Sequence, residues 1–359
     1  MSDKTLQSFN IYQFQEHLID WFVDQQRDLP WRKNKDPYKV WVSEIMLQQT
    51  KVDTVIPYFH HFMKKFPTVH DLAMAEEQEV LKAWEGLGYY SRARNLHQAA
   101  KDVVEKYDGV IPSNPKELGA LKGIGPYTKG AILSIAFMQE EPAVDGNVMR
   151  VLSRLLKIED DIARPKTRKR FEQIVRDMIS GANPSHFNQA LMELGALICT
   201  PKSPTCLLCP VMEHCRAFHS GVEETLPIKS KAKKPKLETF VVLLIKDKDH
   251  TYMIEQRPTD GLLANLWQFP MVPLKEVGLE NLELWFFTEY GFHISLQDQI
   301  GERRHVFTHL IWDLKIYEAR VSGKMEGKKD FIFVESEALH TYPFPVSHKK
   351  IMEYIEQDD

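Results

Sequence analysis

The sequence predicts a mainly α-helical protein in which a larger helical domain is followed by a smaller α/β domain. Apolar residues recur at helical spacing through residues 11–224, whereas β-branched and aromatic runs begin only beyond residue 239. Between them, five lysines at positions 229–236 surround Pro235 without apolar periodicity, which predicts a basic linker over residues 225–238. The length of 359 residues also favours two domains, because one core rarely grows so large.

Helix boundaries and strands can be assigned more closely in several places. Apolar side chains repeat at helical intervals in four segments, residues 11–22, 80–87, 171–180 and 186–198. Gly86 and Gly88 are expected to end the second of these helices, and Ser113-Asn-Pro is expected to begin another. In the second domain we expect strands at residues 240–245, 306–314 and 331–334 and helices at residues 278–290 and 347–357.

The composition excludes several classes of protein. With 43% hydrophobic and 27% charged residues, the chain is an ordinary globular one. No run of about 18 apolar residues occurs, and the N-terminus lacks a signal-peptide core, so we expect a soluble intracellular protein without a membrane partner. The net charge of −4 does not exclude nucleic acid, because unevenly placed charge leaves room for a basic face.

All cysteines of the chain lie in one short segment, residues 199–215. They are Cys199, Cys206, Cys209 and Cys215, spaced as C-x6-C-x2-C-x5-C. Prolines at 201, 204 and 210 keep this segment from forming a helix, so the four thiols can converge. This spacing predicts a metal centre rather than a disulfide framework, and zinc and an iron–sulfur cluster both accept four cysteines.

A glycine hairpin and a helix-start aspartate are the next candidates for function. Gly123 and Gly125 form a tight turn before a helix, where backbone N–H groups can bind a DNA phosphate or simply join two helices. Asp145, in Val144-Asp-Gly-Asn, either caps the following helix or presents a carboxylate to the DNA.

Together, the hairpin, the Val144-Asp-Gly-Asn segment and the cysteine spacing resemble the helix-hairpin-helix DNA glycosylase superfamily, in its iron–sulfur branch with endonuclease III and MutY. The resemblance implies a two-lobed helical domain at residues 1–224 with DNA in the cleft between the lobes. It also implies a helix-hairpin-helix at residues 119–135 and a [4Fe–4S] cluster on the four cysteines of residues 199–215.

The segment from Pro37 to Thr50 is similar to the signature of the adenine glycosylase (MutY) family, in which Glu44 is the catalytic acid. Glu44 falls among apolar residues, where a charge is costly unless it has a task, although a surface glutamate fits the spacing too. Relatives that also cleave the strand carry a lysine two residues after the second hairpin glycine. Tyr127 occupies that position here, so we expect a monofunctional enzyme.

The resemblance implies a division of labour among the site residues. Glu44 would protonate adenine N7, and Asp145 would stabilise the resulting sugar cation or bond to it briefly, with Tyr127 and Asn147 in support. The adenine must first be flipped out of the duplex. Residues expected to line its pocket, or to fill the gap and contact the orphaned base, are Trp31, Arg32, Leu47, Gln189, Gln49, Thr50 and Tyr89.

Residues 239–359 resemble the Nudix-like C-terminal domain of the same family, most clearly at residues 261–270. They lack the R-E-x-x-E-E pattern that a Nudix hydrolase needs for magnesium, so we expect binding rather than hydrolysis. By resemblance, Phe307, Thr308 and His309 read 8-oxoguanine. The expected substrate is double-stranded DNA with A:8-oxoguanine or A:G mispairs, and the expected protein is monomeric, cytoplasmic, nucleoid-associated and of bacterial type.

Three alternatives remain at this stage. The first is an endonuclease III-like pyrimidine glycosylase with lyase activity, against which Tyr127 and the Glu44 segment argue. The second is a non-catalytic, DNA-binding or redox-sensing iron–sulfur protein, for which Glu44 and Asp145 would have to be dispensable. The third is a Nudix pyrophosphatase, which lacks the metal-binding acids it requires.

Overall fold

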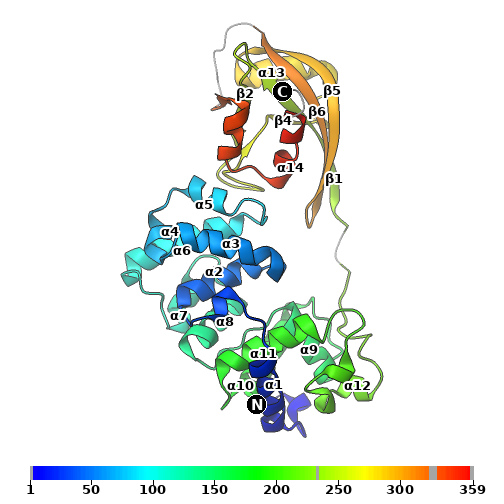
Figure 1. Cartoon of the computed structure of the whole chain (residues 1–359). Coiled ribbons are helices and arrows are strands. Elements are labelled where there is room, and N and C mark those ends of the chain that lie inside the picture. The colour runs from blue at the N-terminus through cyan, green and yellow to red at the C-terminus, as the bar shows by residue number, and fades with distance from the viewer. Residues whose placement is uncertain (1–2, 232–233, 323–329, 356–359) are drawn as a thin grey trace. The chain divides into compact units, whose positions relative to one another are not determined.

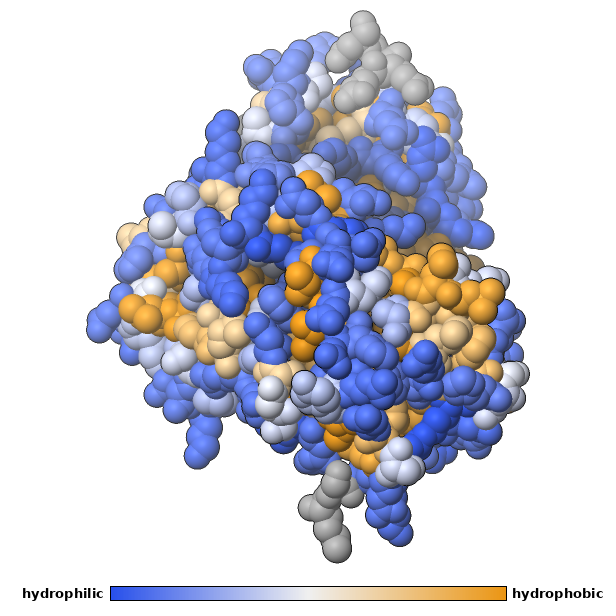
Figure 2. Space-filling view, turned by 60° about the horizontal axis from the view of Figure 1, so that its bottom comes forward, coloured by the Kyte–Doolittle hydropathy of each residue, from blue (hydrophilic) through white to orange (hydrophobic). Residues whose placement is uncertain are grey.

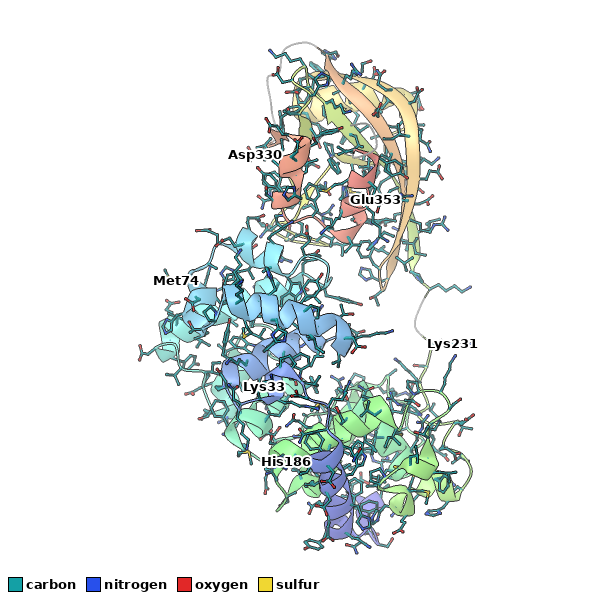
Figure 3. The ribbon with its side chains drawn as sticks, viewed as in Figure 1. Lys33, Met74, His186, Lys231, Asp330 and Glu353 are labelled. Atoms are coloured by element: carbon teal, nitrogen blue, oxygen red, sulfur yellow. The ribbon has the colours of Figure 1, made fainter. Side chains whose placement is uncertain are left out.

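The computed structural model describes residues 3–231, 234–322 and 330–355 and forms two compact units (Figure 1). Unit 1 comprises Met1–Met74 and Asn95–Lys231, and unit 2 comprises Ala75–Arg94 and Ala232–Asp359. Figure 3 labels Met74 and Lys231, the last residues of the two stretches of unit 1. Residues 232–233 of the expected linker and 356–357 of the last expected helix lie outside the described residues.

The described residues of unit 1 are helical without strands, which confirms the expected class of the first domain. Its helices are α1 (Ile11–Gln25), α2 (Pro37–Leu47), α3 (Val52–Lys65), α4 (Val69–Met74), most of α6 (Ser91–Tyr107), α7 (Pro115–Ala120), α8 (Pro126–Phe137), α9 (Gly146–Leu155), α10 (Pro165–Ile179), α11 (Pro184–Leu197) and α12 (Arg216–His219). Helix α11 packs against α1, α8 and α9, and α2 packs against α8.

Short polar residues followed by proline begin several of these helices. Asp36 accepts hydrogen bonds from the first backbone N–H groups of α2, and Asn114 and Asn183 do the same for α7 and α11. Each cap satisfies donors that have no partner within the helix, and proline at the first helical position loses nothing because its N–H would be unpaired. The caps therefore fix where α2 and α11, which carry site residues, begin.

The core of unit 1 is apolar and closely packed. Phe14, Phe22, Phe171 and Phe187 are buried in one cluster that joins α1, α10 and α11. Burying each such side chain stabilises the fold by about 1.5–3 kcal/mol. Gly130 lies where α8 meets the chain at Pro142, and a Cβ atom there would overlap the Pro142 carbonyl.

Unit 2 is a sheet covered by short helices. Its strands are β1 (Lys236–Lys246), β2 (Tyr252–Gln256), β3 (Trp267–Gln268), β4 (Met271–Pro273), β5 (His293–Val306), β6 (Leu310–Ser322) and β7 (Ile332–Val334), in the order β3-β2-β1-β6-β5, with β4 on β1 and β7 on β2. Strands β1 and β6 are parallel, and β5 and β6 form an antiparallel hairpin. The helices are α5 (Glu77–Ala83), α13 (Leu282–Tyr290) and α14 (Val346–Lys349).

Alternate residues of β1 fill two separate cores, one on each face of the sheet. Val242 and Leu244 pack in one core with Phe269 and Trp312, while Val241 and Leu243 belong to the other. This follows from the two-residue period of side chains along a strand.

Two details of unit 2 differ from the sequence predictions. Residues 306–314 are not one strand: β5 ends at Val306, residues 307–309 form a turn, and β6 begins at Leu310. This turn contains no glycine, proline or asparagine that would have indicated it in the sequence. The helix expected at 347–357 is only α14 and a 3-10 turn at Met352–Tyr354, whereas the helix expected at 278–290 is confirmed.

The segment Ala75–Arg94 is bonded into unit 2 by polar contacts. Glu85 accepts hydrogen bonds from Lys349 Nζ at 2.9 Å and from the Phe344 backbone N–H at 3.0 Å. Lys82 donates to the Tyr342 carbonyl at 3.1 Å, and the Trp267 indole donates to Gln78 at 3.1 Å.

The surface carries hydrophilic side chains over most of the face drawn in Figure 2, with hydrophobic side chains exposed among them. Within the described ranges, no helix combines the length and the hydropathy that a membrane crossing requires.

Candidate active site

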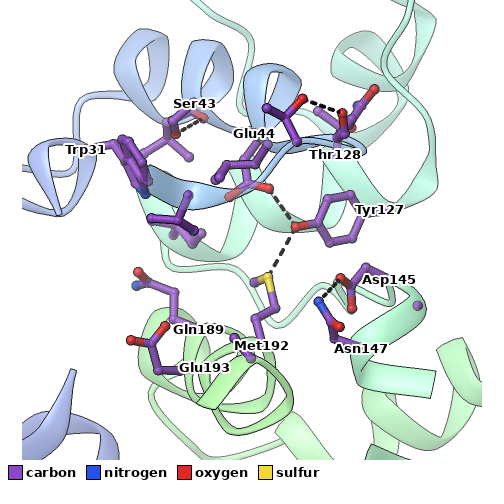
Figure 4. A pocket seen from close by; sticks show the side chains of 18 of the residues that line it. Trp31, Ser43, Glu44, Tyr127, Thr128, Asp145, Asn147, Gln189, Met192 and Glu193 are labelled. Atoms are coloured by element: carbon purple, nitrogen blue, oxygen red, sulfur yellow. Dashed lines mark hydrogen bonds between the residues drawn. The ribbon is translucent and has the colours of Figure 1, made fainter. Parts of the chain in front are cut away.

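A cavity of about 600 Å³ in unit 1 contains most of the residues that the sequence singled out (Figure 4). Its walls come from α2 and the turn after it, from the glycine hairpin and α8, and from the start of α9 and one face of α11. The predicted residues that line it are Trp31, Arg32, Glu44, Leu47, Gln49, Thr50, Gly123, Gly125, Tyr127, Asp145, Asn147 and Gln189. Segments far apart in the chain thus converge on one cavity.

Glu44 is a buried carboxyl group on α2, with only 5% of the residue exposed. Its Oε2 accepts a hydrogen bond of 2.7 Å from the Tyr127 hydroxyl. Burial raises the pKa of Glu44 to about 7, and the nearby Asp145 charge adds to this, whereas the Tyr127 hydrogen bond and the Arg32 charge oppose it. A carboxyl group with this pKa can hold a proton near neutral pH and give it up, as a general acid must.

Tyr127 lies on α8, one turn from the glycine hairpin, and joins two walls of the cavity. Besides Glu44, its hydroxyl contacts Met192 Sδ on α11 at 3.1 Å. Burial and the two carboxylates raise its pKa well above the usual value, so the phenol stays protonated and donates. The family resemblance implied that Tyr127 supports Asp145, but the Tyr127 hydroxyl donates its hydrogen bond to Glu44.

Asp145 caps α9, which is one of the two interpretations that the sequence allowed, and it also faces the cavity (Figure 4). One oxygen accepts from the Val148 backbone N–H at 2.7 Å, and the other accepts from Asn147 Nδ2 at 3.0 Å. Burial raises its pKa, while these hydrogen bonds and the Arg150 charge act in the opposite direction. Asn147 therefore supports Asp145 as expected.

The glycine hairpin has the backbone shape that its sequence indicated. Gly123 has a φ of +83°, and a Cβ there would lie 2.8 Å from the Asn95 Cβ, so glycine is needed on two counts. Gly125 is the N-cap of α8, with Pro126 as the first helical residue. The start of α8 thus borders the cavity.

Several cavity residues were not foreseen from the sequence: Arg27, Gln48, Thr128, Arg168, Met192 and Glu193. Gln48 donates to the Thr128 hydroxyl at 3.2 Å and so ties the turn after α2 to α8. Glu193 accepts hydrogen bonds from Arg27 and Arg32 and is almost fully buried. It could have been found by the signal that marked Glu44, a carboxylate within an apolar helical stretch.

Residues 42–177 match the HhH-GPD superfamily of base excision DNA repair proteins, and residues 241–354 match the NUDIX domain. The chain is 36% identical to an adenine DNA glycosylase of Rattus norvegicus, over 87% of this chain and 71% of that protein. It is 33% identical to one of Buchnera aphidicola subsp. Schizaphis graminum, over 96% and 99%. The chain belongs to the adenine DNA glycosylase family.

Other relatives agree with this family and with the fold. An adenine DNA glycosylase of Arabidopsis thaliana is 36% identical over 88% of this chain, which spans 58% of that protein's length. Among solved structures, a thermostable thymine-DNA glycosylase is 27% identical with a TM-score of 0.53, covering 58% of this chain and 97% of its own. A trapped endonuclease III–DNA covalent intermediate, 24% identical with a TM-score of 0.51, covers 61% and 99% and shares the fold.

The four cysteines of this family member lie around one small pocket in unit 1. Val151, Leu155 and Leu194 supply apolar walls, and Arg154 Nη1 lies 3.3 Å from Cys199 Sγ. Burial raises the pKa of Cys209 to about 12. Within the described ranges, no group of three or more His, Cys, Asp or Glu side chains has the geometry of a metal site, although all four thiols face the same pocket.

The loop of Phe307, Thr308 and His309 lies in unit 2 together with Tyr89. The Thr308 hydroxyl is 3.0 Å from the Tyr89 hydroxyl, and Tyr89 is half exposed with a φ of +49°. Phe307 packs edge-on against Trp312 and His305, and the His309 carbonyl accepts from the Lys236 backbone. Tyr89 and Thr308 thus form one exposed polar pair, which the sequence placed in separate groups.

Proposed function

We propose that this protein is a monofunctional DNA glycosylase that hydrolyses the N-glycosidic bond of adenine mispaired with 8-oxoguanine, or with guanine, in double-stranded DNA. The observation that carries the proposal is the pairing of Glu44 and Asp145 across one cavity. Glu44 has a pKa of about 7, and the helix cap of Asp145 holds its carboxylate beside Asn147. Two carboxyl groups with opposed roles are the usual equipment of N- and O-glycoside hydrolysis.

The reaction uses each group once. Glu44 transfers its proton to adenine N7, and the bond from the sugar C1′ to N9 breaks with its electron pair leaving on adenine. The sugar becomes cationic, and the Asp145 carboxylate stabilises that charge, either through space or by a short-lived bond. Water adds to C1′ and loses a proton, so the products are adenine and an abasic site.

The lining of the cavity supports hydrolysis without strand cleavage. Strand cleavage by relatives of this fold proceeds through a lysine amine that attacks the sugar. Among the described residues that line this cavity none is a lysine, and Tyr127 stands where that amine would be. The Tyr127 hydroxyl donates a hydrogen bond to Glu44.

The turn after α2 supports the proposed flipping of adenine. Gln49 lines the cavity with a φ of +60°, a conformation that non-glycine residues adopt rarely. Strained residues of this kind gather at functional sites. We propose that Gln49 and Tyr89 fill the gap left by the flipped base and that Thr50 contacts the partner base.

For the partner base, the exposed Tyr89–Thr308 pair supports a role in lesion reading. Hydroxyl groups both donate and accept hydrogen bonds, so the pair can form hydrogen bonds with the N7–H and O8 that distinguish 8-oxoguanine from guanine. The test compares Thr308→Ala with Thr341→Ala, whose hydroxyl donates only to a local carbonyl. Only the first should lower the ratio of adenine release opposite 8-oxoguanine to release opposite guanine, and an unchanged ratio would remove the loop from lesion reading.

A [4Fe–4S] cluster fits the donor set of four thiols around an apolar pocket with an arginine N–H directed at one sulfur. Cys199, Cys206, Cys209 and Cys215 would hold it, and it would supply iron–thiolate bonds that hold the segment of residues 199–215 in one folded loop. Iron and inorganic sulfide analysis of the purified chain tests this assignment. About four of each per chain are expected, and stoichiometric zinc without iron would overturn the assignment.

The experiment for the whole proposal is single-turnover base release from four duplexes, with and without hot alkali. They carry adenine opposite 8-oxoguanine, guanine or thymine, and an oxidised thymine. Adenine release from the first two, with strand breaks only after alkali, is expected. Glu44→Gln should abolish release while DNA binding remains, and Glu16→Gln, an exposed glutamate of α1, should change nothing. Release of the oxidised pyrimidine with breaks before alkali would refute the proposal.

A further inference from the structure

We infer that Glu193 is a specificity-determining positioning residue, which sets the hydrogen-bonding groups that the base pocket offers by orienting Arg32 and, through it, the Gln189 amide. This inference rests on the proposed function, because it concerns which base the cavity accepts. Glu193 and Gln189 project from the same helix, α11, on one side of the cavity (Figure 4).

Glu193 is a buried carboxylate held by two arginines. Only 1% of its side chain is exposed. Arg27 donates to both oxygens at 2.8 Å and also through its backbone N–H at 3.1 Å. Arg32 donates to both oxygens at 3.2 Å and 2.9 Å. Burial alone would raise the pKa of Glu193, but the hydrogen bonds from Arg27 and Arg32 outweigh it and lower the pKa to about 2. The carboxylate is therefore ionised and fixed.

The hydrogen bonds to Glu193 hold the Arg32 guanidinium in a single orientation. Two of its nitrogens point at Glu193, and Nη1 also donates to the Arg27 carbonyl at 3.2 Å. The plane of the group further lies over the Phe22 ring, 5.3 Å from its centroid. Because the guanidinium is planar with its donors in a rigid fork, the direction of Nε–H follows from these contacts. That N–H donates to Gln189 Oε1 at 3.1 Å.

The Gln189 amide is consequently fixed at both ends. Its oxygen accepts from Arg32, and its nitrogen donates to the Ser185 hydroxyl at 3.1 Å and to the Ser185 carbonyl at 3.3 Å. If the amide were flipped, its NH₂ group would face the Arg32 N–H and its oxygen would face the Ser185 carbonyl. Each of these contacts would lose a hydrogen bond and become repulsive. The orientation of the amide is therefore fixed, and the second lone pair of Oε1 is left as an acceptor for a ligand.

A fixed acceptor in the cavity discriminates among purines at position 6. Adenine carries an amine there and can donate, whereas guanine, 8-oxoguanine and hypoxanthine carry a carbonyl oxygen that would face another oxygen. A site that hydrogen-bonds one partner rejects analogues that leave its polar groups unpaired far more strongly than an apolar pocket rejects an extra methylene. Glu193 thus protects the lesion base itself from excision.

The test measures single-turnover release of adenine and of hypoxanthine, each placed opposite 8-oxoguanine. Glu193→Gln removes the charge that aligns Arg32, so the ratio of adenine to hypoxanthine release should fall about tenfold, which is the effect of about 1.4 kcal/mol. The matched control is Glu141→Gln, which removes a two-point carboxylate–arginine pair with Arg176 on α10 at 3.2 Å and 3.1 Å. The control should leave the ratio unchanged.

Ser185→Ala keeps the inference testable if Glu193→Gln fails to fold. It frees one N–H of the Gln189 amide without touching Glu193 or Arg32, so hypoxanthine release should rise relative to adenine release. If both variants fold and slow the two bases equally, Glu193 is a structural residue only and the inference is overturned. Failure of the wild-type protein to release adenine from any duplex would instead overturn the proposed function.

Discussion

Tyr127→Phe should move the alkaline limit of adenine release to higher pH. The Tyr127 hydroxyl donates to Glu44 at 2.7 Å and stabilises the ionised carboxylate, which is the form that cannot protonate adenine. Without this donor, Glu44 holds its proton more tightly and its pKa rises from about 7. A hydrogen bond to a charged group contributes about 1.5–3 kcal/mol, and 1.36 kcal/mol corresponds to one pH unit, so the limit should move by roughly one to two units.

The assay is single-turnover adenine release from the 8-oxoguanine duplex between about pH 5 and about pH 9, under conditions where chemistry limits the rate. The control is Tyr38→Phe, since Tyr38 is also buried on a helix but donates to the Phe66 carbonyl at 2.9 Å, away from both carboxylates. It should lower stability without moving the pH profile. An alkaline limit that stays in place in Tyr127→Phe, or moves toward lower pH, would refute the assignment of Glu44 as the titrating acid.

Three further substitutions and one control test what stabilises each of the two units. Burial lowers the pKa of His348 to about 3, below its unfolded value of about 6.5. The stability that neutral His348 contributes to unit 2 should therefore be fully present above about pH 6.5 and be lost as the pH falls toward about 3. His348→Asn should flatten this dependence in thermal melts recorded at a series of pH values. Gly130→Ala should cost about 1–3 kcal/mol in urea titration, because its Cβ would overlap the Pro142 carbonyl, whereas Gly146→Ala meets nothing nearby and should cost little. Glu85→Gln should speed hydrogen exchange of unit 2 amides, because it weakens its ion pairs with two lysines.

The sequence carried much of the fold because local signals agree with the tertiary structure. Asp36 and Pro37 mark the start of α2, and Gly123 and Gly125 mark the turn before α8. Apolar spacing indicated α1, α10 and α11. By contrast, no glycine, proline or asparagine marks the turn at Thr308 between β5 and β6.

The site could be predicted as a set of residues but not as a set of contacts. The sequence brought Glu44, Asp145 and Tyr127 together through the family resemblance. It did not show that the Tyr127 hydroxyl bonds to Glu44 rather than Asp145, because that depends on the register of α8 against α2. The contacts of Glu193 with Arg27 and Arg32 were missed for the same reason, since Glu193 lies 166 and 161 residues away from them in the chain.

Because Ala75–Arg94 belongs to unit 2, this segment cannot complete its contacts during synthesis until the later part of unit 2 has been made. These residues are synthesised before the rest of unit 2, yet the groups of that later part to which Gln78, Lys82 and Glu85 bond lie between Asn265 and Lys349. At about 5–20 residues per second, the early segment waits on the order of tens of seconds for those partners. A nascent chain therefore carries an incomplete surface at Ala75–Arg94 until residues 265–349 have been made, and a chain truncated before them cannot form these contacts.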